Sequence, residues 1–239
     1  MTSSFHDTRW TLVARSRGSG AEGRGALSEL CAAYYGPVVV FLRRDGREED
    51  VARELAHDFF ARLLEGGAME GADPERGRFR SYLLAAVKRF AADQRERAGA
   101  LKRGGGYEQV SLQSGGTDTE PGLQVEDAQV MAPDAAFDRE WAVTLLARAL
   151  VSLERTLGEE GKAEHFAVLK PWLTTGLDDQ PQAAAAAQLG ISEAAVKVAI
   201  HRLRQRFREA VRGEIAQTVS APEVVEEELE ALRAALRRR

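Results

Sequence analysis

The chain has 239 residues, of which 44% are hydrophobic and 29% charged, a balance that excludes disorder throughout and leaves room for one large domain or two small ones. Its formal net charge of −4 is unusual for a protein that binds DNA strongly by itself, so any DNA contact should be local and should need a partner. The lack of long apolar runs and of a secretion-signal pattern, together with a single cysteine, Cys31, predicts a cytoplasmic protein without membrane contact.

Residues 8–103 are predicted to form a first group of helices. The glycine-rich segment 18–25 is expected to break the first helix, and Pro37 to interrupt or kink the second, because proline lacks a backbone N–H. Apolar residues in 48–65 fall at three- and four-residue spacing, which predicts an amphipathic helix. The expected inward residues of this helix are Val51, Leu55, Phe59 and Leu63, with Ala52, Ala56 and Phe60 widening the stripe. In another helix at 79–103 they are Phe79, Leu83, Ala86 or Val87, and Phe90.

Residues 104–134 differ from both flanks, since they are rich in glycine, serine, threonine and acidic residues and have no sustained period, which predicts a flexible acidic linker. Helices resume over 135–219, and 220–239 predicts a C-terminal helical extension whose apolar stripe needs burial against this chain or a partner. That stripe is Val225, Leu229, Leu232 and Leu236. No stretch alternates strictly as a strand does. The predicted fold class is all-α, with two helical domains, 8–103 and 135–219, joined by the linker.

A helix-turn-helix pattern lies within 181–212. Pro181 suits the first turn of a helix, where a missing N–H costs little, and a run of alanines follows it. Gly190 can take a positive φ in a tight turn, and Ser192 is positioned to cap the next helix, with Glu193 in its first turn. This order of elements is typical of proteins that place the second helix in the major groove of DNA.

The second helix of this pattern has an apolar face and, beside it, a basic face. Lys and Arg side chains there suit phosphates or the acceptor edge of guanine. A helix that is merely solvated on its basic side is the alternative, and the glycine turn and serine cap favour DNA recognition over it. The apolar residues are Val196, Ile200, Leu203 and Phe207, and the basic ones are Lys197, His201, Arg204 and Arg208, flanked by Arg202 and Arg206.

Over most of its length the sequence resembles the extracytoplasmic-function (ECF) group of bacterial RNA polymerase sigma factors. LGISEAAVKVAIHRLRQRFREAV is similar to the promoter-binding domain four of that group, and EEDVARELAHDFFARLLE to the domain-two helix that docks on the polymerase clamp. RGRFRSYLLAAVKRFAADQRER is similar to the segment that melts and recognises the minus-10 element. TRWTLV, PERGRFRS, KRGGG and EIAQTV together resemble one subgroup with a C-terminal extension. The resemblance implies a protein without a catalytic centre that tethers polymerase to a promoter and helps to open the duplex.

The resemblance implies three sets of site residues: one for the minus-35 element, one for the minus-10 element and one for core polymerase. At the minus-10 element a single DNA strand is expected, and proteins hold single strands by combining aromatic stacking with basic charge. The set for the minus-35 element is Ser192, Lys197, Val198, His201, Arg202 and Arg204. The set for the minus-10 element is Arg76, Gly77, Arg78, Phe79, Arg80, Tyr82, Lys88, Arg89 and Asp93. The set that faces core polymerase is Asp50, Glu54, His57 and Asp58.

Each set has a plainer explanation that stays open. Phe79 and Tyr82 suit core packing at least as well as stacking on a base, and a run of charge on a helix is usually a solvated face. The sequence also departs from the pattern of the group at His57, Ala185 and Val198. The polymerase contact, the packing of the first helix of the helix-turn-helix and the promoter preference are therefore less well specified.

The partners that the resemblance implies are core RNA polymerase, through the clamp region of its β′ subunit, and promoter DNA. It leaves open whether an anti-sigma factor or another regulator, phosphorylation or expression level controls the protein. Net acidity fits a chain that binds promoter DNA poorly when isolated, because counterion release needs concentrated positive charge. We interpret 220–239 as an interaction or regulatory element, and favour its packing against this chain.

Two other functional classes compete with this interpretation. An enzyme is disfavoured because the four histidines lack metal-ligand spacing, Cys31 has no basic neighbour in sequence and 18–25 lacks a phosphate-loop signature. We therefore expect no cofactor and no bound metal. A stand-alone helix-turn-helix transcriptional regulator would use the same recognition helix, with 8–103 as a sensor. Residues 48–103 favour the sigma factor, because they match its pattern and offer no evident ligand pocket.

Overall fold

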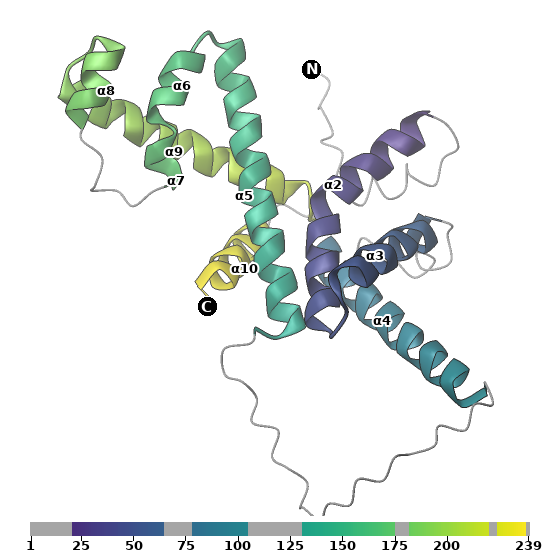
Figure 1. Cartoon of the computed structure of the whole chain (residues 1–239). Coiled ribbons are helices and arrows are strands. Elements are labelled where there is room, and N and C mark those ends of the chain that lie inside the picture. Colours follow the sequence, from purple (N-terminus) through teal and green to yellow (C-terminus); the bar gives the residue numbers. More distant parts are fainter. Residues whose placement is uncertain (1–20, 65–77, 105–130, 175–181, 220–223, 238–239) are drawn as a thin grey trace, which may run out of the picture.

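The computed structural model describes residues 21–64, 78–104, 131–174, 182–219 and 224–237. These residues form α-helices joined by turns, and no strand is found among them, which confirms the all-α fold class. In chain order the helices are α2 Ala21–Arg44, α3 Glu49–Leu64, α4 Phe79–Gly104, α5 Pro133–Glu159, α6 Ala163–Leu169, α7 Pro171–Thr174, α8 Gln182–Leu189, α9 Glu193–Ala216 and α10 Val225–Arg237 (Figure 1).

Helices α2, α3 and α4 meet through aromatic rings and small side chains. Phe59 packs edge to face on Phe90, with ring centroids 5.5 Å apart. Ala52 and Ala56 are fully buried, so α3 meets its neighbours there through small side chains and turns Val51, which is 42% exposed, towards solvent. The predicted inward position of Val51 is therefore wrong. All the inward positions predicted for α4 are buried, Ala86 and Val87 alike.

The structure bears on two expectations about α2. The helix begins at Ala21, so residues 21–25 of the glycine-rich segment 18–25 are helical, and a glycine costs a helix only about 1 kcal/mol. The earlier helix that this segment is expected to break lies outside the described residues. The helix also continues through Pro37, so the expected interruption is wrong, while Figure 1 shows α2 bent along its length, in keeping with the expected kink. Pro37 and Val38 are both buried, so packing offsets the backbone hydrogen bond that proline cannot make.

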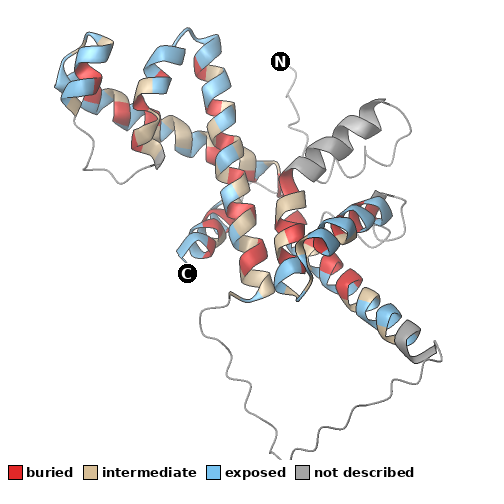
Figure 2. Ribbon diagram, in the orientation of Figure 1, coloured by how far each residue is buried: buried red, intermediate tan, exposed pale blue. Residues whose placement is uncertain are grey.

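Helix α5 is the central element, and two hydrophobic cores share it (Figure 2). Its first part, from Phe137 to Ala149, packs in a core with α2, α3, α4, the end of α9, and α10. Its last part, around Leu153 and Leu157, packs in a second core with α6, α7, α8 and the start of α9. The predicted division into domains stays a prediction, and residues 105–130 of the predicted linker lie outside the described part of the chain.

The helices of the second core are short and end at identifiable residues. Pro171 separates α6 from α7, because it has no N–H to continue the first of them. Among the described helices, none is by itself long and apolar enough to cross a membrane. Only α8 and α9 taken together pass that test of length and composition, across a bend of 97°.

Helix α10 lies beside α5 and the end of α9 (Figure 1). Leu229 and Leu232 are buried in the first core, Val225 is half-buried against it, and Leu236 is 38% exposed. The apolar stripe of the C-terminal helix is therefore covered largely by this chain itself. Arg212 of α9 adds an ion pair to Glu226, with 2.5 Å between Nη1 and Oε1.

Candidate nucleic-acid interface

Helices α8 and α9 form a helix-turn-helix unit, with a bend of 97° between them. Gly190 has a φ of +64°, which residues with a Cβ rarely adopt. Ile191 donates its N–H to Ala186 O at 3.1 Å and so ends α8. Ser192 caps α9, because its Oγ accepts a hydrogen bond from Ala195 N at 3.2 Å. The predicted glycine turn and serine cap are both confirmed.

Helix α9 turns an apolar face to the second core and a basic face to solvent. The core stripe is confirmed, with Val196, Ile200 and Leu203 buried and Phe207 half-buried. On the first half of the helix the exposed side chains include Lys197, Val198, His201 and Arg202. These four lie at i, i+1, i+4 and i+5, so they share one accessible surface next to the cap.

Two arginines further along α9 are held by the protein itself. Arg204 is half-buried and donates from Nε and Nη2 to Trp172 O, at 3.4 Å each. Arg206 donates from Nη1 to Glu160 Oε2, at the end of α5, over 2.8 Å. Hydrogen bonds from Arg206 and then Lys162 lower the pKa of Glu160 to about 2, and the bond to Glu160 raises the pKa of Arg206. Arg204 supports the fold here, and its DNA contact stays a prediction.

A groove of about 520 Å³ lies between α6 and the first half of α9. Its walls include apolar side chains such as Phe166 and Leu169. Two residues predicted to contact the minus-35 element, Val198 and Arg202, also line it, so the recognition surface is partly concave. Its basic residues are Lys162, His165, Arg202 and Arg206. The groove has no signal in the sequence, because helices that are distant along the chain form it.

The residues predicted to face core polymerase lie on the solvent side of α3. Asp50, Glu54, His57 and Asp58 are all exposed. The ring of His57 stacks on Tyr35 of α2, with centroids 5.2 Å apart, so this side chain is positioned by a neighbouring helix. The four residues form an accessible, mainly acidic surface, and their contact with polymerase stays a prediction.

The start of α4, where the minus-10 contact is predicted, is built into the first core. Phe79 is fully buried and packs edge to face on Tyr34, with centroids 5.1 Å apart. Its backbone N–H donates to Thr218 O, just after α9, at 3.4 Å. Tyr82 is half-buried against the same core. In this arrangement Phe79 is a core residue, as the plainer explanation of the sequence has it, and neither base contact is tested.

Arg78 and Arg80 are held by carboxylates from α5 and α10. Glu228 of α10 is 1% exposed, and its oxygens lie 2.8 Å from Arg78 Nε and 3.2 Å from Arg80 Nε. Arg80 also pairs with Asp138 and lies over the Trp141 ring, 4.7 Å from its centroid. Burial acts to lower the pKa of Arg80, but the charges of Glu228 and Asp138 outweigh it and raise the pKa above its ordinary value.

The remaining residues predicted for the minus-10 element are more accessible. Lys88, Arg89 and Asp93 are exposed along α4. Lys88 pairs with Asp134 at the start of α5, with 2.6 Å between Nζ and Oδ2. Arg76 and Gly77 lie outside the described residues. The segment is therefore partly available and partly occupied by this chain.

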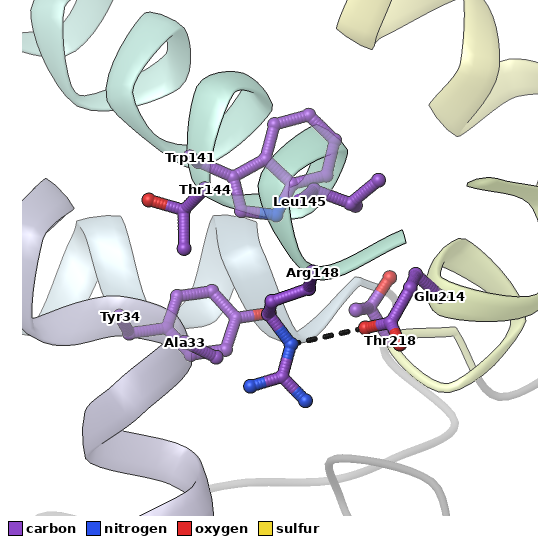
Figure 3. A pocket seen from close by; sticks show the side chains of 8 residues that line it. All are labelled: Ala33, Tyr34, Trp141, Thr144, Leu145, Arg148, Glu214 and Thr218. Atoms are coloured by element: carbon purple, nitrogen blue, oxygen red, sulfur yellow. Dashed lines mark hydrogen bonds and ion pairs between the residues drawn. The ribbon is translucent and has the colours of Figure 1, made fainter. Parts of the chain in front are cut away.

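Figure 3 shows the junction at which α2, α5 and the end of α9 meet. Arg148 of α5 donates from Nε to Glu214 Oε2 of α9 at 3.0 Å, beside Tyr34 and Trp141. The cavity between these side chains measures about 10 Å³, which is room for about one water molecule. The junction is therefore a packing contact rather than a ligand site.

Sequence reasoning missed the acidic partners of the minus-10 segment. Glu227, Glu228 and Asp138 meet Arg78 and Arg80 although about 60 to 150 residues separate them along the chain. The only local indication was the acidic run 226–228 at the start of the last predicted helix. Such a run indicates a negative surface, but it does not show which basic residues lie opposite it.

In a comparison with known families, residues 38–213 match the family described as ECF sigma factor. The match covers more than half of the 239 residues and includes α3, α4, α8 and the capped first half of α9. Comparisons with curated proteins and with solved structures give no match. The subgroup with a C-terminal extension stays a prediction, since the matched region ends before α10. The family match and the helix-turn-helix geometry agree, and the chain belongs to the ECF sigma factor family.

Proposed function

We propose that this sigma factor binds core RNA polymerase through α3 and recognises and opens promoter DNA through α9 and α4. The family supplies the broader role, which is transcription initiation with core RNA polymerase and promoter DNA as partners, and it is not a family of enzymes. The finer assignment concerns which surface meets which partner. It also places the protein in the cytoplasm, where polymerase and promoter meet.

The observation that carries the proposal is the capped start of α9. Lys197, His201 and Arg202 stand exposed within the first turns after the cap at Ser192. A recognition helix reads base edges with its N-terminal residues, and Lys or Arg there can bind phosphate or guanine. This supports the assignment of the minus-35 contact to Ser192, Lys197, Val198, His201 and Arg202.

The polymerase contact is assigned to the exposed surface of α3, where Asp50, Glu54, His57 and Asp58 lie. We assign it to the clamp region of the β′ subunit on the strength of the resemblance of this helix. The opening of the duplex is assigned to the start of α4, whose basic side chains suit a single strand. These two assignments rest on the motif order and on the basic and acidic character of the two surfaces.

The decisive experiment is promoter-specific transcription by bacterial core polymerase with and without the purified chain, on promoters mapped after its overexpression. Arg202→Ala is expected to cost about 1–3 kcal/mol of promoter binding, or roughly 5- to 150-fold in promoter-specific initiation, without a change in stability. Arg155→Ala removes an equal and exposed charge from α5, away from the basic face of α9, and should change initiation little.

Two results would contradict the proposal. One is a purified chain that does not co-migrate with core polymerase, or a mixture that initiates nowhere in particular. The other is tight promoter binding by the chain alone, which would identify a stand-alone helix-turn-helix regulator instead.

A further inference from the structure

Three cations of the minus-10 segment are each paired with carboxylates from other parts of the chain. Their pairing is Arg78 with Glu227 and Glu228, Arg80 with Glu228 and Asp138, and Lys88 with Asp134. We call these four carboxylates the carboxylate cover; two come from α5 and two from α10. The positive charge of these three side chains is therefore already neutralised within the protein, whereas Arg89 stays exposed.

The members of the cover differ in accessibility. Lys88 and Asp134 are each about half exposed, so their ion pair is weak and exchanges readily with solvent ions. Arg80 and Glu228 are 9% and 1% exposed, so no phosphate can approach Arg80 unless Glu228 moves away. Removing one partner of such a buried pair leaves an uncompensated charge, which is strongly destabilising. Glu228 is therefore the group that shields Arg80 from a phosphate.

We propose that the free chain is a closed sigma factor, in which α10 packs on α5 and the end of α9 and Glu228 latches the arginines at the start of the minus-10 segment. This inference rests on the assignment of the minus-10 contact to α4. The apolar stripe of α10 supplies the docking energy through Leu229 and Leu232, and the carboxylates supply the match to the basic segment. The latch thus hides the strand-binding arginines from free DNA.

In the closed arrangement, the two predicted DNA-binding segments are closer together than the two promoter elements are. Helix α9 has 24 residues, or about 36 Å, and its end is hydrogen-bonded to the start of α4 through Phe79 and Thr218. Even if α9 and α4 were collinear, Ser192 and Asp93 would be at most about 65 Å apart. The positions minus-35 and minus-10 differ by about 25 base pairs, which is about 85 Å at about 3.4 Å per base pair. The closed chain is therefore too short to engage both elements at once.

The other two surfaces stay accessible in the closed arrangement. The acidic face of α3 and the basic face at the start of α9 are both exposed. Polymerase can therefore dock before α10 leaves, and release of the latch becomes a step that follows polymerase binding. Regulation of this kind prevents the free chain from binding a minus-10 strand through these arginines without polymerase.

The test uses the full chain without polymerase and a fluorescent single-stranded 20-mer of mixed sequence. Glu228→Gln is expected to speed hydrogen exchange over residues 79–90 and to strengthen binding of the 20-mer by about tenfold or more, because the binding-competent fraction rises. Glu230→Gln is the matched control. It neutralises an exposed carboxylate of the same helix that pairs only with Arg233 among the described residues, and it should behave as wild type.

A second variant guards against a Glu228→Gln chain that fails to fold. Glu226→Lys reverses an exposed charge that faces Arg212, so it repels α10 from α9 without burying an unpaired group. For Glu226→Lys we again expect faster hydrogen exchange over residues 79–90 and tighter binding of the 20-mer, both smaller than for Glu228→Gln, and Glu230→Lys is its control. If Glu228→Gln does not fold, these two measurements on Glu226→Lys decide the question.

Unchanged exchange in the folded variants would overturn the latch, and so would faster exchange with unchanged strand binding. Control variants that bind as tightly as the test variants would overturn it as well. Transcription by wild-type chain plus core polymerase is measured in parallel. Its absence would remove the proposed function, whereas the exchange and strand-binding results would still decide whether α10 covers α4.

Discussion

Gly190 holds the turn between α8 and α9 in the left-handed region, with φ at +64°. A Cβ at this position would meet no atom within 4 Å, so backbone conformation rather than space determines the residue type. Gly213, near the end of α9, is also open around its Cβ position but has ordinary helical geometry. The same chemical change should therefore have opposite effects at the two positions.

Gly190→Ala is expected to lower the free energy of unfolding by about 1 kcal/mol or more, because alanine is strained at positive φ. Gly213→Ala is expected to raise it by about 0.5–1 kcal/mol, because alanine loses less conformational entropy in a helix. Urea unfolding followed by circular dichroism measures both. Equal effects of the two substitutions would contradict the assignment of the turn.

Arg80 shows how the surroundings of a side chain can outweigh its type. Its charge and its place in a basic segment predicted an exposed DNA contact, but the structure buries it between Glu228, Asp138 and the face of Trp141. A guanidinium is tolerated there because it stays charged and has donors enough for both carboxylates. A residue that is predicted to contact DNA is therefore also the residue that joins α4 to α5 and α10.

Helix α9 performs two tasks with its two ends. The first half carries the exposed basic face, and the second half packs between the two cores through Phe207 and Ala210. Arg206 lies at the boundary between the two halves and forms an ion pair with Glu160 at the end of α5. This contact joins the end of α5 to the middle of the recognition helix.

Glu160→Gln tests that contact through its pH dependence. The pKa of Glu160 falls from 4.5 to about 2 on folding, so the pair stabilises the fold above about pH 4.5 and this stabilisation is lost as the pH falls towards 2. The difference in Tm between wild type and variant should therefore be largest near neutral pH and shrink below about pH 4.5. Glu159→Gln removes only a pair with Arg155 within α5 and should show a smaller difference. A difference independent of pH would exclude the ion pair as its cause.

At the scale of the whole molecule, α5 joins the two cores into one body. Phe137 and Trp141 belong to the first core, and Leu153 and Leu157 to the second. The carboxylate cover joins the minus-10 segment to α5 and to α10. A change that moves α4 away from α9 while α9 stays with α5 and α10 must therefore also break these ion pairs. Opening is expected to be a movement of large parts of the chain.

An energy-transfer measurement checks this expectation. With Cys31→Ser to remove the native thiol, dyes on Ala85→Cys and Ala194→Cys should lie within about 50 Å in the free chain. Their separation should rise by about 20 Å or more when core polymerase and promoter DNA are added, because the promoter elements are about 85 Å apart. A control pair, Ala61→Cys with Ala85→Cys, should keep its separation. Transcription without any change in the first distance would contradict the opening.

The sequence by itself determined what depends on near neighbours. Helical periodicity predicted the all-α class, the inward residues of α4 and the core stripe of α9, and the chemistry of Gly190 and Ser192 predicted the turn and the cap. Motif order predicted the sigma factor family that the comparison then showed. These features follow from contacts within a few residues, which a sequence displays directly.

Only the tertiary structure decided how distant segments meet. Val51 faces solvent because alanines make the close approach of α3, and α2 continues through Pro37 because packing compensates for a missing hydrogen bond. The pairing of Glu228 with Arg78 and Arg80 depends on how α10 folds back across the chain. Burial and long-range ion pairing are properties of the assembled cores. The basic segment at the start of α4 is therefore predicted to be exposed from the sequence, whereas in the fold carboxylates cover Arg78 and Arg80.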